Sequence, residues 1–180
     1  MAFFAITLSG IILAGIYGIL HDQLTYTISH EYYTKFKFYQ FGLSRTGKEA
    51  FMPYPRISVA AVGFLATWWM GIPISIILGL VGLIHKDGKT MYNATIKAFL
   101  ITMLIAFLTG LIGLGYGWFF LSTQSRDNFD WWYIPDNIIQ FRNFISVGSM
   151  HNFSYLGGLT GLIGGIIYTI RKRNKLLKTP

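Results

Sequence analysis

The side chains of this sequence best suited to bind a metal ion or to move protons are two imidazoles and two carboxylates, His21, Asp22, Glu31 and His151. His21 and Asp22 directly follow one long apolar run, and His151 stands just before another. If both runs cross a membrane in opposite directions, the two histidines lie at the same face. We therefore expect them to lie within a few ångströms of each other, with Asp22 or Glu31 beside them.

Imidazoles and carboxylates are ligands of zinc, iron, manganese and copper, so these four residues are the candidate metal ligands and a transition metal ion is the candidate cofactor. Gln23, Asn152 and Tyr155 are candidates for the hydrogen-bonding groups that orient such ligands. Three alternatives stay open: a proton relay, a small-ligand site, and simple capping of helix ends. No HExxH motif strengthens the metal interpretation.

Composition places these residues in a membrane protein. The chain is 53% hydrophobic and 12% charged, whereas a soluble domain has about 25% charged residues. The formal charge of +8 sits mainly at the ends of apolar runs, which is typical of contacts with a lipid bilayer and excludes nucleic acid as the expected partner. The absence of cysteine excludes disulfides and thiolate metal ligands.

Four apolar runs predict membrane spans at about residues 3–20, 57–84, 94–121 and 153–170 of a single domain covering residues 1–180. Small residues recur every fourth position in each run, as at Gly157, Gly161 and Gly165, which favours close helix packing. Pro73 predicts a kink in the second span. The expected fold class is an all-α membrane protein, a four-transmembrane-helix bundle with two ordered extramembrane loops.

The two loops cover residues 21–56 and 122–152. Alternating apolar and polar residues at 24–28 and 35–39 favour two short strands, so a β-hairpin is expected in the first loop. The basic run that begins at Arg171 directly follows the last span. This dense basic run beside a span indicates that both termini lie in the cytoplasm, with the chain a multi-pass membrane protein and both loops outside.

Four short strings of the sequence resemble the motifs of an uncharacterised family of bacterial four-span membrane proteins. They are HDQLT at 21–25, EYYT at 31–34, ATWWMG at 66–71 and HNFSYL at 151–156. In that family the second string usually reads Glu-Tyr-Phe-Thr, and a proline or small apolar residue often stands where this chain has His30. The resemblance implies shared architecture and little else, and it gives His30 no family-wide role.

Three classes of function fit the sequence. The first is a protein that binds a metal ion or relays protons at the His/Asp/Glu cluster on the outer membrane face. The second is a non-catalytic structural or assembly subunit, either of a membrane complex or of a homo-oligomer. The third is a solute or ion transporter, against which stands the lack of charged residues within the spans, apart from Lys97 near one end. No nucleophile stands beside a recognisable base, so the sequence supports no hydrolase chemistry, and whether the protein is an enzyme stays open.

Overall fold

The computed structural model describes residues 1–44 and 49–176, and this part of the chain is helical, with no β-strand. Four segments are long and apolar enough to cross a membrane, Ala2–Ile28, Pro55–Gly82, Gly88–Thr123 and Phe141–Lys175. The expected class, an all-α protein with four membrane-spanning segments, is confirmed. The helices are α1 (Ala2–Ile28), α2 (His30–Tyr32), the π-helical turn η1 (Tyr33–Lys37), α3 (Phe38–Gln40), α4 (Pro55–Thr67), the 3₁₀ turn η2 (Trp68–Met70), α5 (Gly71–Gly82), α6 (Gly88–Phe119), the 3₁₀ turns η3 (Leu121–Thr123) and η4 (Arg126–Phe129), and α7 (Phe141–Leu176).

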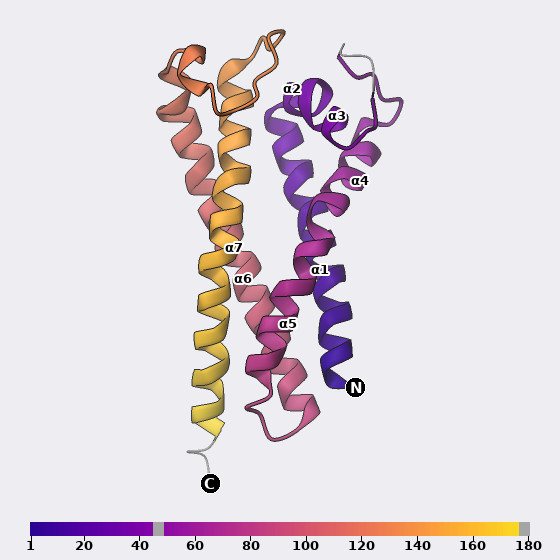
Figure 1. Cartoon of the computed structure of the whole chain (residues 1–180), viewed down its shortest axis with the longest axis vertical. Coiled ribbons are helices and arrows are strands. Elements are labelled where there is room, and N and C mark those ends of the chain that lie inside the picture. The colour runs from indigo at the N-terminus through magenta and orange to yellow at the C-terminus, as the bar shows by residue number, and fades with distance from the viewer. Residues whose placement is uncertain (45–48, 177–180) are drawn as a thin grey trace.

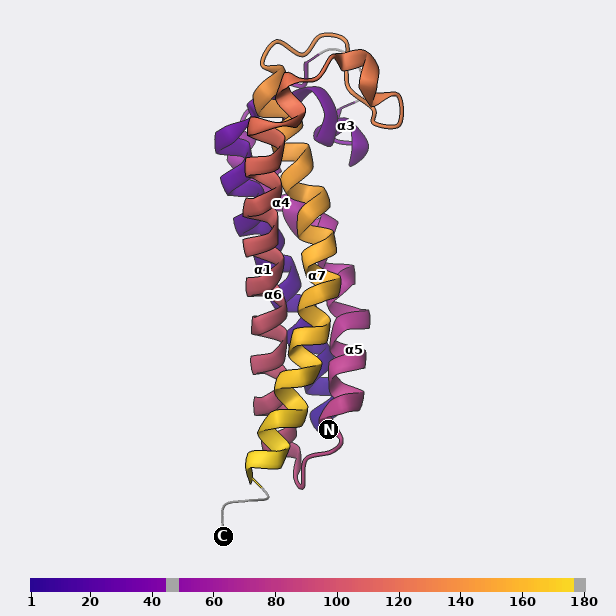
Figure 2. The same ribbon diagram turned by 90° about the vertical axis from the view of Figure 1, so that its left-hand side faces the viewer.

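The long helices form two pairs that lie side by side along the long axis of the molecule (Figures 1 and 2). In one pair α6 packs against α7 over most of its length, and in the other α1 packs against α4 and α5. The N-terminal end of α1 and the C-terminal end of α7 lie at the same end of the bundle (Figure 1). The opposite end, which we call the cap end, carries α2, η1, α3 and the connection between α6 and α7.

The first and last helices are longer than the predicted spans. α1 continues through His21 and Asp22 to Ile28, and α7 begins at Phe141, before His151. The helices extend because their polar residues are satisfied inside the protein; the Thr25 hydroxyl, for example, donates to the carbonyl of His21 at 3.1 Å. Both histidines therefore lie within helices rather than at helix ends.

The predicted β-hairpin is wrong. Residues 24–28 form the last turns of α1, and residues 35–39 lie in η1 and α3. The strand prediction failed because it assumed that the lysines of residues 35–39 face solvent. In the structure Lys35 and Lys37 are both buried. The aromatic residues around them enter a compact apolar core at the cap end, made by Tyr26, Tyr32, Tyr33, Phe38, Ala50, Val59, Val62, Ile138, Phe144 and Val147.

Small residues bring the helices of each pair into backbone contact, as the sequence predicts. A Cβ atom at Gly63 of α4 would collide with the carbonyl of Gly18 of α1. The hydroxyl of Thr67 donates across the same contact to the carbonyl of Ala14 at 2.8 Å. In the other pair, Thr102 of α6 donates to the carbonyl of Gly161 of α7 at 3.1 Å. Such close contacts replace the hydrophobic drive that is missing between helices in lipid.

The second span changes direction at η2, just before Pro73. Proline has no N–H to donate to the carbonyl of Trp69, four residues earlier, and the N–H of Gly71 is directed at the carbonyls of Trp68 and Trp69 in a tighter turn instead. As a result α4 stays against α1, whereas α5 also contacts α6 and α7. The kink thus separates the two helix pairs in the half of the bundle near the cap and joins them in the other half.

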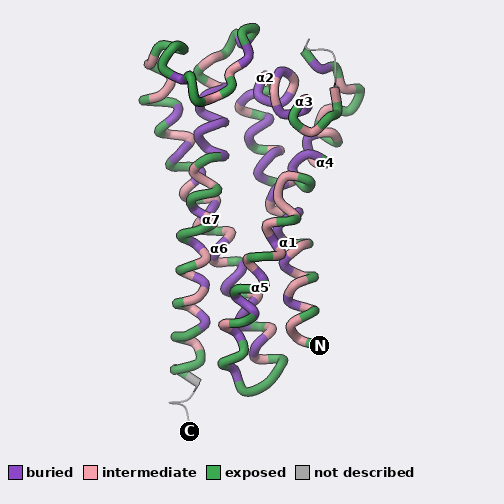
Figure 3. The backbone as a smooth tube through the Cα atoms, viewed as in Figure 1, coloured by how far each residue is buried: buried purple, intermediate pink, exposed green. Residues whose placement is uncertain are grey.

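Exposure follows this arrangement. Exposed residues run along the outer sides of all the long helices, and buried ones continue from the bundle into the α2 region of the cap (Figure 3). Many exposed residues within the spans are large and apolar, among them Leu8, Ile12, Leu104 and Ile163. These side chains form the surface that a bilayer covers.

Candidate functional site

The structure brings His21, Asp22 and His151 together, as expected, and adds Lys37. The rings of His21 and His151 are 4.8 Å apart between centroids and meet edge to face. One ligand atom from each of His21, Asp22 and His151 lies within 4.8 Å of the others. These three residues and Lys37, which we call the buried cluster, are all at most 8% exposed.

Lys37 lies between Asp22 and His151 in the buried cluster. Its Nζ donates to Asp22 Oδ2 at 2.7 Å and contacts His151 Nε2 at 3.0 Å. His151 Nδ1 lies 2.9 Å from the carbonyl of Val147, which can only accept, so Nδ1 carries a proton. In the neutral ring Nε2 is then the acceptor and Lys37 its donor. An ammonium therefore lies between the carboxylate and the imidazole, at the place where a metal ion bound to both would sit.

Asp22 is the residue that all the other members approach. Its Oδ1 lies 3.3 Å from His151 Nε2 and 3.5 Å from His21 Nδ1, while Oδ2 is bonded to Lys37. The other nitrogen of His21, Nε2, is 3.1 Å from the hydroxyl of Ser154. A continuous set of polar contacts therefore runs from Lys37 through Asp22 and His21 to Ser154.

The π-helical turn η1 explains how Lys37 reaches the buried cluster. Its wider turn follows α2 without a break and directs both lysines of the segment inward, where Lys35 contacts Glu31 and Lys37 contacts Asp22. Tyr33, four residues before Lys37, holds the turn against α1 because its hydroxyl lies 2.6 Å from that of Thr25. The Lys37 ammonium also lies 5.3 Å from the centre of the Tyr33 ring.

Burial changes the pKa of Lys37. Removal from water lowers the pKa of its ammonium below the ordinary lysine value, and the Asp22 carboxylate opposes this effect only in part. The ammonium is therefore held by its partners rather than by solvent, and it is easier to deprotonate than an exposed lysine.

A cavity of about 90 Å³ begins at the buried cluster and extends into the bundle between the two helix pairs. Its polar end is formed by the cluster with Tyr17 and Ser154, and its walls are mostly apolar, including Met70, Ile74, Phe99 and Met103. Tyr155, half exposed, lies at its rim. The cavity therefore extends from the buried cluster past the kink, because both α4 and α5 contribute to its walls.

Glu31, the fourth candidate ligand, is not part of the buried cluster. Its carboxylate accepts from the backbone N–H groups of Ile139 at 3.0 Å and Gln140 at 2.6 Å and is paired with Lys35, which also donates to the carbonyl of Asn137. Burial raises the pKa of Glu31, but the Lys35 ammonium and the two N–H groups outweigh it and leave the pKa lowered. Glu31 thus ties the first loop to the start of α7.

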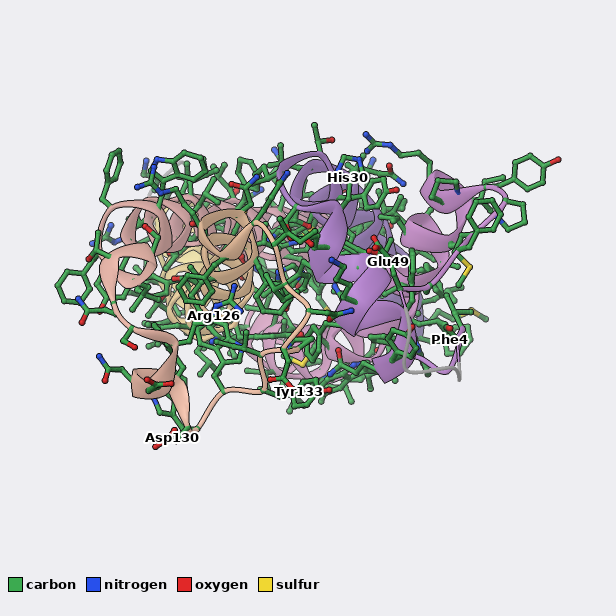
Figure 4. All side chains as sticks on the ribbon, turned by 90° about the horizontal axis from the view of Figure 1, so that it is seen from above. Phe4, His30, Glu49, Arg126, Asp130 and Tyr133 are labelled. Atoms are coloured by element: carbon green, nitrogen blue, oxygen red, sulfur yellow. The ribbon has the colours of Figure 1, made fainter. Side chains whose placement is uncertain are left out.

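The view onto the cap end shows where two acidic residues of the loops lie (Figure 4). Asp130 lies at the outer edge of the connection between α6 and α7 (Figure 4). Glu49 lies over the α2–α3 segment, where its carboxylate accepts from the hydroxyl of Thr34 at 2.9 Å (Figure 4).

Of the three residues expected to support the site, one lies beside it. Gln23 is turned towards α4, where it donates to the carbonyl of Arg56 at 2.7 Å. Asn152 is exposed. Tyr155 lines the cavity at its rim. No hydrogen bond joins it to His21 or His151 in the described part of the chain.

Sequence reasoning missed Lys37, Ser154 and Tyr17. Ser154 stands three residues after His151, so the two share a helix face, and that spacing could have identified it. Lys37 is four residues after Tyr33, and a helical reading of residues 33–37 would have placed both on the buried side.

Comparisons of this chain with known protein families, with curated proteins and with solved structures find no match. The geometry of the buried cluster and cavity is therefore what supports a function.

The pairing of Lys37 with Asp22 predicts strong coupling between the two residues. Lys37→Met should lower the free energy of unfolding by about 3–5 kcal/mol, because it leaves a buried carboxylate without its cation. Asp22→Asn should also destabilise. The double variant should lose clearly less than the sum of the two single losses, as denaturant titration in detergent would measure. Simple addition of the two losses would contradict a direct pair.

Proposed function

We propose that this protein binds and exchanges a proton at the buried cluster, near the outer face of the membrane and at the polar end of the cavity. The observation that carries the proposal is the position of Lys37, whose Nζ contacts both Asp22 Oδ2 and His151 Nε2. Buried ionisable groups in membrane proteins are costly, and proton relays are one of their recurrent uses.

The cluster offers two arrangements of one proton with almost the same atom positions. In the first, Lys37 is an ammonium that donates to neutral His151. In the second, an N–H bond of Lys37 breaks and the proton binds to His151 Nε2, so the lysine becomes a neutral amine and the ring becomes an imidazolium. Asp22 Oδ1, 3.3 Å from that nitrogen, then faces the positive charge. A proton can therefore be stored at either residue while the carboxylate stabilises both states.

A resident metal ion is the less favoured alternative for the same residues. His21, Asp22 and His151 supply a suitable ligand set, but the Lys37 ammonium repels a divalent ion and holds the atoms that would bind it. The non-catalytic subunit and the general transporter are supported by no particular contact in the site.

The proposal predicts that Lys37 titrates below the ordinary lysine pKa of about 10.4. Selective ¹⁵Nζ-lysine labelling in nanodiscs, with Lys37→Arg to assign the signal, measures the midpoint by NMR. Between the two pKa values the folded protein binds fewer protons than the unfolded chain, so the free energy of unfolding should rise with pH in this window. A midpoint at or above the ordinary value would overturn proton exchange at Lys37.

The second prediction separates proton exchange from metal binding. Co²⁺, followed by its visible absorption, should bind the Lys37→Met variant at least tenfold more tightly than the wild type, because the competing cation is gone. Adding His151→Ala to Lys37→Met should abolish that binding, whereas adding His85→Ala, in the connection between α5 and α6 and outside the buried cluster, should leave it intact. Binding to the wild type as tight as to Lys37→Met would favour the metal interpretation instead.

We further propose that the chain resides in a bacterial inner membrane with both termini in the cytoplasm and the buried cluster near the outer face. The basic residues that follow the last span, and the position of the N-terminal end of α1 and the C-terminal end of α7 at one end of the bundle, support this orientation (Figure 1). The resemblance to the family of bacterial four-span proteins supports the bacterial setting.

Reporter fusions test the orientation. Alkaline phosphatase fused after Pro180 should be inactive, because it folds only outside the cytoplasm, and the same enzyme fused after Ser125 should be active. Green fluorescent protein at the two positions should give the opposite pattern. An active phosphatase at Pro180 would reverse the orientation without affecting the site.

A further inference from the structure

We propose that the cavity binds a neutral, membrane-soluble molecule that carries a hydroxyl or carbonyl oxygen on an alkyl chain. The oxygen would lie at the buried cluster and the chain along the apolar walls. This inference rests on the proposed function in that the bound oxygen would be the group that meets the exchangeable proton. Its physical basis, however, is the shape and polarity of the cavity.

The cavity walls match an alkyl chain. Met70, Phe99 and Met103 provide flexible and flat apolar surface from the kinked second span and from α6. Gly158 of α7 also lines the cavity, and a Cβ atom built there would have no neighbour within 4 Å. The volume of about 90 Å³ is smaller than the roughly 150 Å³ cavity that holds benzene in another protein, so a slender chain fits better than a bulky ring system at this depth.

The polar end of the cavity has hydrogen-bonding groups left over. The hydroxyl of Tyr17 is buried and makes no well-formed hydrogen bond in the described part of the chain, with the Ser154 side chain as its polar neighbour. It lies at the same end as His21 and Ser154, which are bonded to each other. Buried hydroxyls are rarely left without a well-formed hydrogen bond, so Tyr17 is available to donate to an oxygen atom of a ligand.

The charge of the buried cluster favours a ligand whose polar group is neutral. Lys37 and Asp22 carry opposite charges and are bonded to each other, so with neutral imidazoles the cluster has no net charge. An anionic head would face Asp22 and a cationic head would face Lys37, and each would have to break the pair. A neutral oxygen can accept from Tyr17 or Ser154 and leaves the pair intact.

The cavity is also placed for entry from the bilayer. It lies among membrane-spanning helices, and its rim includes half-exposed Tyr155 within the last span. A lipid-soluble molecule can therefore reach it sideways without crossing the cap.

Photolabelling tests the inference. The probe is a ten-carbon primary alcohol with a diazirine in mid-chain, added to the protein in nanodiscs at pH 8, with labelling measured by intact-mass spectrometry and sites by peptide mapping. We expect insertion near Met70 and Met103. Excess 1-decanol or 2-decanone should compete, and the stronger competitor identifies the polar group as a hydroxyl or a carbonyl. Competition by decanoate as strong as by both neutral molecules would overturn the neutral-head assignment.

Matched glycine variants test the cavity itself. Gly158→Leu should reduce labelling at least fivefold, because its side chain fills the cavity. Gly115→Leu is the control, since Gly115 likewise has open space around its Cβ position but does not line the cavity. Ala66→Leu, on the facing wall, gives a second blocking variant if Gly158→Leu unfolds. Equal labelling of blocking and control variants would overturn the inference.

The variant Tyr17→Phe tests the polar end of the cavity. Loss of the hydroxyl should raise the 1-decanol concentration needed for half-competition by about three- to tenfold, the worth of one hydrogen bond. An unchanged value would remove Tyr17 from the site. The Lys37 titration is measured without any probe, so a failure of ligand binding and a failure of proton exchange give separate results.

Discussion

The contact of Lys37 with Asp22 and His151 is the interaction on which the arrangement of this protein depends. Asp22 belongs to α1, His151 to α7 and Lys37 to the π-helical turn of the cap. α1 and α7 otherwise touch little, because the kink in the second span separates the helix pairs at this level. One ammonium thus connects both pairs and the cap through two contacts of about 3 Å.

The cost of burying these groups explains why they occur as a set. An isolated carboxylate or ammonium at the membrane edge would lose several kcal/mol of hydration, and only close partners offset that loss. Every charged member of the buried cluster has such a partner, and Tyr32 stacks on His151 at 5.0 Å to exclude water from one side. The members of the buried cluster therefore stabilise one another, and removal of one leaves a buried charge without its partner.

Much of the fold was predictable from the sequence because its determinants are local. Apolar runs of membrane length gave the four spans, small residues at every fourth position gave the contacts at Gly18 and Gly161, and Pro73 gave the kink. The approach of His21 to His151 followed from two helices that run in opposite directions. The role of Lys37 was not predictable in this way, because it depends on a single wide turn whose sequence alternates like a strand. The contacts of Glu31 were not predictable either, because its residue type and its place in the first loop suit a metal ligand and do not reveal that its carboxylate accepts from the backbone just before α7.

The kink and the buried cluster together account for the cavity. Close packing through glycine would by itself join all four spans along their length and leave no space between them. Pro73 prevents this, because it sends α5 across to α6 and α7 while α4 remains with α1. The pairs would then be free to close in the other half as well, but the polar side chains of the cluster and the cap above them keep His21 and His151 at a fixed separation. A space with apolar walls and one polar end is the necessary result, and it joins the only described group of converging histidine and carboxylate ligands to the interior of the membrane.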